Sequence, residues 1–279
     1  MLPKTSFEVE VSQSFEATSD SVFASLYIPK NSARQVISNE INKSPQLNLV
    51  YKNSKGDRKA IWSSDQVTKK AFINYSFEFV GQAIQYNISD SLLVVQEHSP
   101  VFDEYLKPTK NIQSKHPFIK DLHREKVGDQ DTLIKVLNRI YNYCYSIQPK
   151  PFRGVTDALT AAKLEEASCN GKSRLFVALC QNSNIPARLV GGVILNVGSK
   201  KTSHQWVEVY VNGNWIPFDA LNGHFAQLPS NYLTLYHGDE FLISHTKNIG
   251  YDYGFNIKKK LVTNPVLRTE LKSNLFNAY

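Results

Sequence analysis

The dipeptide Asn212-Gly213 restricts the fold more than any other feature of this sequence, because Asn-Gly between strand-like segments is a strong β-hairpin signal. Before it, residues 203–211 alternate with a period of two, which predicts a strand. After it, Trp215 opens the return strand. A two-residue loop fixes the register, so Val211 is expected to pair with Asn214.

This register has a consequence for two polar residues of the ribbon. It places Trp206 opposite Asp219 and His204 opposite Leu221, so Asp219 is diagonal to His204 at roughly 7–8 Å, a gap that side chains can close. An imidazole held by a carboxylate is the base that a cysteine nucleophile needs. Glu208, on the same face, is a second candidate partner, and a purely structural His-Asp hydrogen bond remains an alternative.

Cys169 supplies the candidate nucleophile. Apolar residues at helical spacing follow it, and the helix should end at Asn184, which tolerates a left-handed backbone and precedes Ile185-Pro186. A thiol at a helix start has a lowered pKa, because the helix dipole favours an anion there. Gly171 should keep the first turn slim, so that a substrate carbonyl can reach backbone donors. A small buried cysteine is the alternative.

The other cysteines and histidines carry weaker signals. Cys144 and Cys180 lie on apolar helical stripes and are predicted to be packing residues, and the spacing of the three cysteines favours neither disulfides nor a metal site. We therefore expect no metal. His224 could line the same cleft as Asp219, as could Trp206, whereas loop or surface roles are expected for His98, His116, His123, His237 and His245.

Charge and hydropathy exclude several function classes. The net charge of +7 comes from scattered basic pairs and triplets that are not interleaved with aromatic residues, so nucleic acid is not an expected partner. No run of 18 apolar residues exists, and the first 20 residues lack the pattern of a signal peptide. The chain as given is expected to be soluble.

The distribution of patterns along the chain predicts an α+β protein. Residues 7–95 read as short alternating strands separated by turns, which predicts a β-sandwich domain over 1–98. Residues 99–128 contain three prolines and are expected to form a connector. Helical periodicity starts at Asp131, and a short helix is expected near 156–165, so 129–279 is predicted to be the second domain, with a C-terminal β extension.

Three blocks of the second domain resemble the transglutaminase-like superfamily. They are CNGKSRLF at 169–176 with NIPAR at 184–188, HQWVEVY at 204–210, and WIPFD at 215–219. The resemblance implies a papain-like fold, and it implies that Cys169, His204 and Asp219 are catalytic and act on amide bonds without a cofactor. Three positions depart from the usual pattern and affect the shape of the cleft: Ser168, Gln205 and Ala220.

A second resemblance covers nearly the whole chain. The segments LYIP at 26–29, RKAIW at 58–62 and LPSNYL at 228–233 resemble bacterial proteins described as inactive transglutaminases fused to seven transmembrane helices. It implies a soluble, periplasmic part of an inner-membrane protein. The implied partners are the transmembrane helices and an ATP-grasp ligase-like protein. All three triad positions are filled here, so inactivity does not follow.

These observations favour a cysteine-dependent amide hydrolase, a peptidase or amidase that acts through a thioester on a peptide or an amide-linked polymer. Three other functions stay open. The cleft could bind a peptide without catalysis, the acyl group could pass to an amine as in a transglutaminase, or the N-terminal sandwich could bind carbohydrate or another envelope component.

Overall fold

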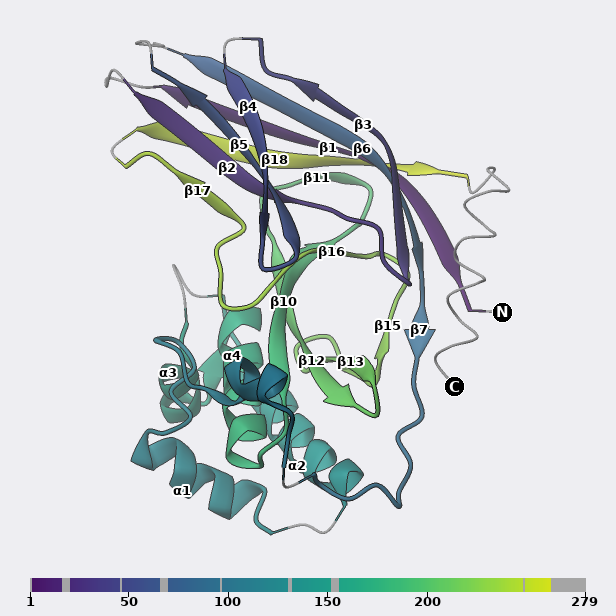
Figure 1. Cartoon of the computed structure of the whole chain (residues 1–279), viewed down its shortest axis with the longest axis vertical. Coiled ribbons are helices and arrows are strands. Elements are labelled where there is room, and N and C mark those ends of the chain that lie inside the picture. Colours follow the sequence, from purple (N-terminus) through teal and green to yellow (C-terminus); the bar gives the residue numbers. More distant parts are fainter. Residues whose placement is uncertain are drawn as a thin grey trace. The chain divides into compact units, whose positions relative to one another are not determined.

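The computed structural model describes residues 2–16, 21–45, 47–65, 70–95, 97–129, 132–151, 156–247 and 249–261 (Figure 1). It contains two compact units. The first is built from Met1–Ile84, Gly191–Ser203 and Pro229–Tyr279, and the second from Gln85–Val190 and His204–Leu228. The chain passes between the units within strand β10 (Ala187–Ile194).

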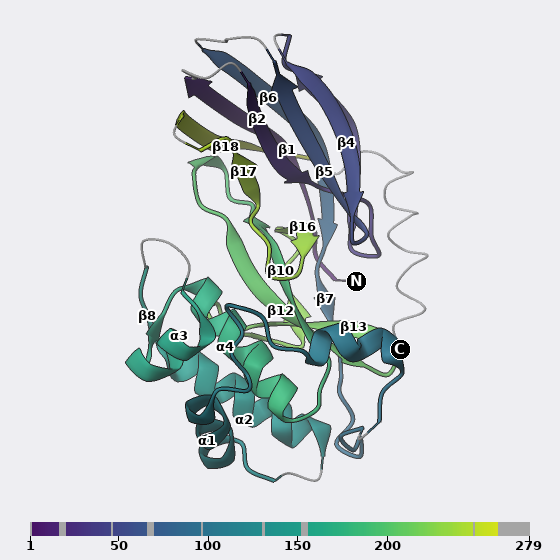
Figure 2. The same ribbon diagram turned by 60° about the vertical axis from the view of Figure 1, so that its left-hand side comes forward.

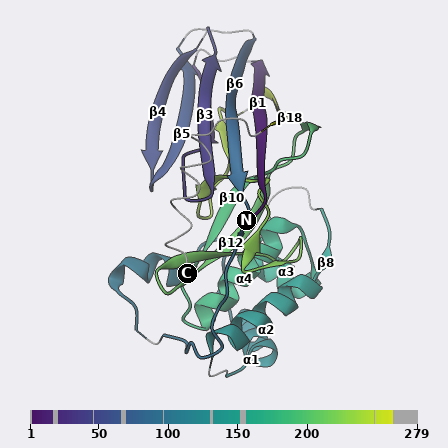
Figure 3. The ribbon, with the colours of Figure 1, turned by 90° about the vertical axis from the view of Figure 1, so that its right-hand side faces the viewer.

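The first unit holds two antiparallel sheets. One has the order β11-β18-β1-β6-β3, and Figure 3 shows its strands β1, β6 and β3 side by side. The other has the order β17-β2-β5-β4. The strand bounds are β1 Lys4–Glu16, β2 Val22–Ile28, β3 Gln35–Lys43, β4 Asn48–Ser54, β5 Asp57–Ser64, β6 Ala71–Gln82, β11 Gly198–Lys200, β16 Tyr232–His237, β17 Ile243–His245 and β18 Gly250–Lys260.

One apolar core lies between these two sheets. Along β1 the alternate residues Phe7, Val9 and Val11 are buried, as expected for a strand with one inward face. They belong to the same cluster as Leu26 of β2 and Trp62 of β5. The predicted N-terminal β-sandwich is therefore confirmed.

The bounds of this sandwich differ from the predicted 1–98. Strand β18 pairs with β1 over the whole length from Ser6↔Lys260 to Glu16↔Gly250, so the segment predicted as an extension of the second domain completes the first unit. Residues 85–98 belong to the second unit instead. Sequence period identifies a strand but does not identify its partner, and here the partner is about 240 residues away.

The second unit combines helices with an antiparallel ribbon. Helix α4 packs against the other three helices and against β12, and it lies among the helices in Figure 2. Four of its strands lie side by side in the order β14-β13-β12-β10, and the ribbon predicted from the sequence is the hairpin of β12 and β13. The remaining bounds are η1 Pro100–Leu106, α1 Pro117–Lys126, α2 Leu133–Ser146, α3 Ala158–Leu164, α4 Cys169–Asn182, β7 Ile84–Gln85, β8 Gln148–Pro149, β9 Glu166–Ala167, β12 His204–Val211, β13 Asn214–Asp219, β14 His224–Phe225 and β15 Gln227–Leu228.

The predicted connector 99–128 is part of this second unit. It forms η1 and α1, and Ile119 and Leu122 of α1 are buried in the unit's core. Two of the three prolines that suggested a loop, Pro100 and Pro117, stand at helix starts, where a missing N–H costs nothing, and Pro108 lies between η1 and α1. The spacing of prolines alone does not distinguish a loop from a segment in which prolines begin helices.

Helix α2 has the predicted apolar stripe, and Cys144 on it is buried. The predicted start at Asp131 lies outside the described residues, and α2 begins at Leu133. Near its end Tyr141 is buried, whereas Tyr143 is only partly buried. Within the residues that the structure describes, no helix has the length and apolar character needed to cross a membrane.

Candidate active site

The hairpin β12–β13 has the predicted register, with Val211 paired to Asn214 and Tyr210 to Trp215. Its turn residues Asn212 and Gly213 have φ values of 45° and 85°. A two-residue turn with both central residues in the left-handed region matches the twist of the flanking strands, and Asn-Gly tolerates that backbone. The turn chemistry thus fixes which residues of the two strands lie together.

At the far end of this ribbon, His204 and Asp219 are in contact. Nε2 of His204 lies 2.6 Å from Oδ2 of Asp219, and the side chains are 8% and 1% exposed. The contact expected from the register is therefore present. A buried ion pair is stable only when its polar atoms have partners, so the other contacts of the carboxylate matter.

The turn that follows β13 supplies those contacts. Oδ1 of Asp219 accepts hydrogen bonds from the backbone N–H groups of Leu221, at 2.9 Å, and Asn222, at 3.1 Å. Oδ2 accepts one from the side-chain amide of Asn222 at 2.8 Å, and the same Nδ2 lies 3.2 Å from Nε2 of His204. Asn222 was not among the site residues predicted from the sequence. The signal was available, because an aspartate at a strand end commonly caps the N–H groups that follow it.

Cys169 is the first residue of α4, at the position predicted from the sequence. Helix α4 stops where expected, since Asn184 has a φ of 54°. The imidazole of His204 and the backbone N–H of Gln205 lie close enough to the Cys169 sulfur to lower the pKa of the thiol, and the thiol lies 3.8 Å from Oδ1 of Asn170, to which it donates. Because Nε2 of His204 is engaged by Asp219, Nδ1 is the nitrogen left for the sulfur.

The electrostatics of this group favour a thiolate next to an imidazolium. Burial opposes ionisation of Cys169, but the hydrogen bond and the charge of His204 outweigh it, and the pKa of the thiol is lowered. Burial likewise opposes protonation of His204, yet Asp219 and Cys169 raise its pKa to about 9. The pair is therefore suited to nucleophilic attack followed by proton donation.

The two other thiols behave as packing residues, as predicted. Cys144 and Cys180 are fully buried in the core of the second unit. Burial raises the pKa of both thiols far above the ordinary value. A thiol that stays protonated is a poor nucleophile, so the two buried cysteines contrast with Cys169.

The neighbours of His204 on β12 have distinct roles. Trp206 is fully buried, and its ring stacks near the His204 ring with centroids 6.1 Å apart and planes 21° apart. Glu208 pairs with Arg188 of β10, whose Nη2 lies 2.7 Å from Oε2. The guanidinium of Arg188 in turn lies 4.1 Å from the centre of the Trp215 ring. Glu208, the second candidate partner of His204, thus forms its ion pair with Arg188.

Gly171 and His224 lie near the triad in different ways. A Cβ at Gly171 would meet side-chain atoms of Ala167 and Thr156 at 2.8 Å, so this face of the helix is packed against the protein. The structure thus gives Gly171 a packing role in place of the expected opening for substrate. His224 is the strand partner of Asp219 and is half-buried, and burial lowers its pKa.

The other histidines make local structural contacts. His116 accepts a hydrogen bond from Phe118 and caps α1. Nε2 of His123 lies 2.7 Å from Oγ of Ser183. The remaining contacts are His98 with the carbonyl oxygen of Asn184, His237 with Asp57, and His245 with the carbonyl oxygen of Thr246. Among the residues that the structure describes, no group of three or more potential metal ligands is found.

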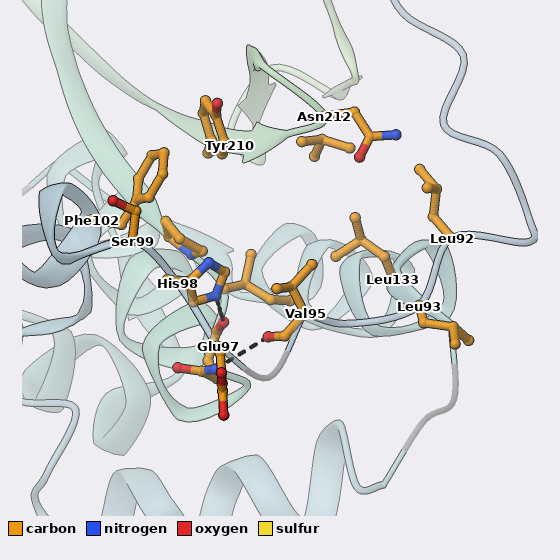
Figure 4. A pocket seen from close by; sticks show the side chains of 14 residues that line it. Leu92, Leu93, Val95, Glu97, His98, Ser99, Phe102, Leu133, Tyr210 and Asn212 are labelled. Atoms are coloured by element: carbon orange, nitrogen blue, oxygen red, sulfur yellow. Dashed lines mark hydrogen bonds between the residues drawn. The ribbon is translucent and has the colours of Figure 1, made fainter.

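The second unit also contains a pocket of about 260 Å³ near the C-terminal end of α4 (Figure 4). Its lining is largely apolar, and hydrogen bonds tie His98 and the backbone of Val95 to Asn184 at its edge. The triad side chains are not among the residues that line it. Its lining includes Leu92, Val95, Phe102, Leu133, Tyr210 and Asn212.

Two family models match the chain. Residues 120–220, which include Cys169, His204 and Asp219, match the model described as the transglutaminase-like superfamily. Residues 3–126 match the model described as inactive transglutaminase fused to 7 transmembrane helices. Both resemblances inferred from the sequence are confirmed over these ranges. The second match ends at residue 126, before Cys169.

One solved structure supports the fold, and a second is less similar. A crystal structure described as a "putative cysteine protease" from Cytophaga hutchinsonii has a TM-score of 0.74 and 17% identity, covering 94% of this chain and 93% of that one. The periplasmic domain of TgpA from Pseudomonas aeruginosa, bound to ethylmercury, has a TM-score of only 0.37 at 12% identity, covering 77% of this chain and 89% of that one. A search of curated proteins gives no significant match. Over residues 120–220 the chain thus matches the transglutaminase-like superfamily, and its fold is that of the Cytophaga hutchinsonii structure.

Proposed function

We propose that this protein is a cysteine-dependent hydrolase of amide bonds, with Cys169 as nucleophile, His204 as acid and base, and Asp219 as the residue that orients His204. One observation carries the proposal. Nε2 of His204 lies 2.6 Å from the carboxylate of Asp219, and the imidazole is close enough to the Cys169 thiol, at a helix start, to lower the pKa of that thiol. Nucleophile, base and orienting group in one chain of contacts are what acyl transfer through a cysteine requires.

The reaction would proceed in two steps. The Cys169 thiolate attacks the carbonyl carbon and forms an S–C bond, and the C–N bond breaks as Nδ1 of His204 gives its proton to the leaving amine. Water then attacks the thioester, one proton of the water passes to His204, and the S–C bond breaks to release the carboxylic acid. The backbone N–H of Cys169, the first residue of α4, would donate to the oxyanion in both steps.

The test is cleavage of amide-linked substrates. The proteins compared are wild type, Cys169→Ala and Cys180→Ala. Each is incubated with a panel of peptides and envelope-type amide-linked polymers, and the masses of the products are determined by mass spectrometry. We expect hydrolysis by wild type and by Cys180→Ala, which removes a buried thiol of the same helix, and no hydrolysis by Cys169→Ala. Equal product with Cys169→Ala would refute the assignment of the nucleophile.

The same experiment separates the alternatives. A product whose mass equals the acyl fragment joined to an added amine would assign the protein to acyl transfer. Saturable binding of peptides without any covalent change, together with slow reaction of the Cys169 thiol with iodoacetamide, would assign it to a non-catalytic binding module. The family whose model matches residues 3–126 is described as an inactive transglutaminase, and that description favours the binding module.

We also propose an extracytoplasmic location, on the periplasmic side of an inner membrane. The support is the match of residues 3–126 to proteins fused to transmembrane helices. Such helices and an ATP-grasp ligase-like protein are then proposed partners. Fusion of a reporter that is active only outside the cytoplasm tests the location, and loss of its signal contradicts it. Co-purification with the full-length protein tests the ligase-like partner, and its absence from the membrane fraction that holds the protein argues against it.

A further inference from the structure

Asn222 is an exposed residue whose side chain reaches a buried pair. Its Nδ2 donates to Oδ2 of Asp219 at 2.8 Å and lies 3.2 Å from Nε2 of His204. Its backbone N–H donates to Oδ1 of the same carboxylate at 3.1 Å. Asp219 is 1% exposed, whereas Asn222 faces solvent, so the amide stands between the carboxylate and water.

We propose that Asn222 is a positioning residue of the triad, acting through Asp219 on His204. Oδ2 of the carboxylate is shared by two donors, the imidazole of His204 and the amide of Asn222. Two donors at fixed positions leave the carboxylate little freedom to rotate, and the imidazole follows it. This inference rests on the proposed function, because it concerns how the same three groups are held.

The turn that carries Asn222 is itself anchored. Gly223 has a φ of 76°, and a Cβ at this position would lie 3.7 Å from the ring of Tyr145, so the turn passes close to α2. Further along the chain, the rings of Phe225 and Tyr141 of α2 meet edge to face with centroids 5.1 Å apart. This contact with α2 holds the segment that follows Asn222, so the Asn222 amide can act as a fixed donor.

Removal of the amide has a definite electrostatic consequence. The carboxylate of Asp219 loses a donor and becomes accessible to water, which screens its charge and lets it rotate. His204 is then less well held as an imidazolium, and the thiolate of Cys169 loses part of its stabilisation. The change therefore appears as a raised pKa of the thiol, even though Asn222 does not touch the sulfur in the contacts described.

The experiment is the pH dependence of iodoacetamide modification at Cys169, followed by mass spectrometry in wild type, Asn222→Ala, Asn222→Leu, Asn214→Ala and His204→Ala. Asn222→Leu keeps the bulk of the side chain but removes the donor. Asn214→Ala is the matched control, because Asn214 lies on the same ribbon and bonds only to the Asn212 carbonyl in the contacts described. Circular dichroism and thermal unfolding establish that each variant is folded.

We expect the acidic limb of the rate profile to move up by about one pH unit in both Asn222 variants, which is about a tenfold slower reaction below the limb. Asn214→Ala should match wild type. A lowered melting temperature with an unmoved limb would show a structural role only and would overturn the proposal, as would a wild-type profile in Asn222→Leu.

The proposed function fails by a different result. If the limb of wild type itself lies at the ordinary thiol pKa, about 8.5, and does not change in His204→Ala, Cys169 is not activated and there is no triad to position. If wild type shows a low limb that depends on His204 while Asn222→Ala matches it, the triad stands and only the role of Asn222 is refuted.

Discussion

Nε2 of His204 lies 2.6 Å from Oδ2 of Asp219, and this contact determines which imidazole nitrogen can serve the nucleophile. With Nε2 engaged by the carboxylate, Nδ1 is left to exchange a proton with Cys169. The orienting carboxylate is almost fully buried, so its charge acts on the imidazole with little screening by water. The arrangement makes Asp219 more than a hydrogen-bond acceptor, because its charge also sets the protonation of His204.

Replacement of Asp219 by asparagine tests that statement. The amide keeps the size of the side chain but removes the negative charge, so the pKa of His204 should fall from about 9 toward its ordinary value. We expect Cys169 to react with iodoacetamide at least about tenfold more slowly at neutral pH, since it loses the imidazolium partner. NMR titration of the His204 ring protons measures the first effect directly.

The matched control for this change is Asp252→Asn, which alters an exposed carboxylate that pairs with Lys201 in the first unit. It should leave both measurements as in wild type. An unchanged titration of His204 in Asp219→Asn would mean that the carboxylate does not hold the imidazolium, and the assigned role of Asp219 would be wrong.

The pH dependence of hydrolysis follows from the two shifted groups. The pKa of Cys169 is lowered, so the thiolate persists at pH values where an ordinary cysteine is protonated. The pKa of His204 is raised to about 9, so the imidazolium persists up to that pH and is lost above it. We expect hydrolysis to decline above about pH 9, because His204 can no longer protonate the leaving amine.

Alkylation by iodoacetamide provides the comparison, because it needs the thiolate but no proton donor. It should continue above pH 9, where hydrolysis declines, so the two rate profiles separate on the basic side. Parallel profiles up to pH 10 would show that proton donation by His204 does not limit the cleavage of the amide.

The three thiols should differ strongly in reactivity. Cys144 and Cys180 are fully buried and their pKa values are raised by burial, whereas Cys169 is only partly buried and its pKa is lowered. We expect modification of Cys169 to be complete before either of the others reacts in the folded protein, and peptide mapping after brief labelling reports the order. In denaturant the three rates should converge, which controls for reagent access. Equal rates in the folded state would contradict the assigned environments.

The geometry of the site could be predicted from the sequence because it depends on local rules. The Asn212-Gly213 turn fixes the ribbon register, and the register places His204 beside Asp219. The helix start at Cys169 follows from apolar spacing and from the stop at Asn184. Each of these steps spans fewer than about 20 residues, the range over which turn chemistry and period are informative.

The features of the fold and of the site that could not be predicted from the sequence depend on contacts between residues far apart in the chain. The pairing of β18 with β1 joins the two ends of the described chain, and no local pattern specifies it. The commitment of Glu208 to Arg188 needs β10 beside β12, which the hairpin alone does not reveal. Gly171 was expected to face substrate because of its position near Cys169, but the packing of α3 on α4 decides which way its surface points.

Gly171 therefore yields a stability prediction. In Gly171→Ala the new methyl group would lie 2.8 Å from side-chain carbons of Thr156 and Ala167 and 3.2 Å from Cβ of Ala161, closer than carbon atoms pack. Helix α3 and the residues that flank it, Thr156 and Ala167, would have to move away from α4, at a cost of about 1–3 kcal/mol typical of overpacking. That cost exceeds the roughly 1 kcal/mol that alanine gains over glycine within a helix. We expect a lower melting temperature together with slower modification of Cys169, since the start of α4 shifts with the helix.

Gly250→Ala is the control for the added methyl group, because a Cβ there meets only Cβ of Glu16 at 3.7 Å, an ordinary contact distance. It should leave the melting temperature within about a degree or raise it, since alanine reduces the entropy of the unfolded chain. If Gly171→Ala proves as stable as wild type, the first turn of α4 has room for a side chain after all. Gly171 would then return to its sequence-based role as an opening through which substrate approaches the backbone donors.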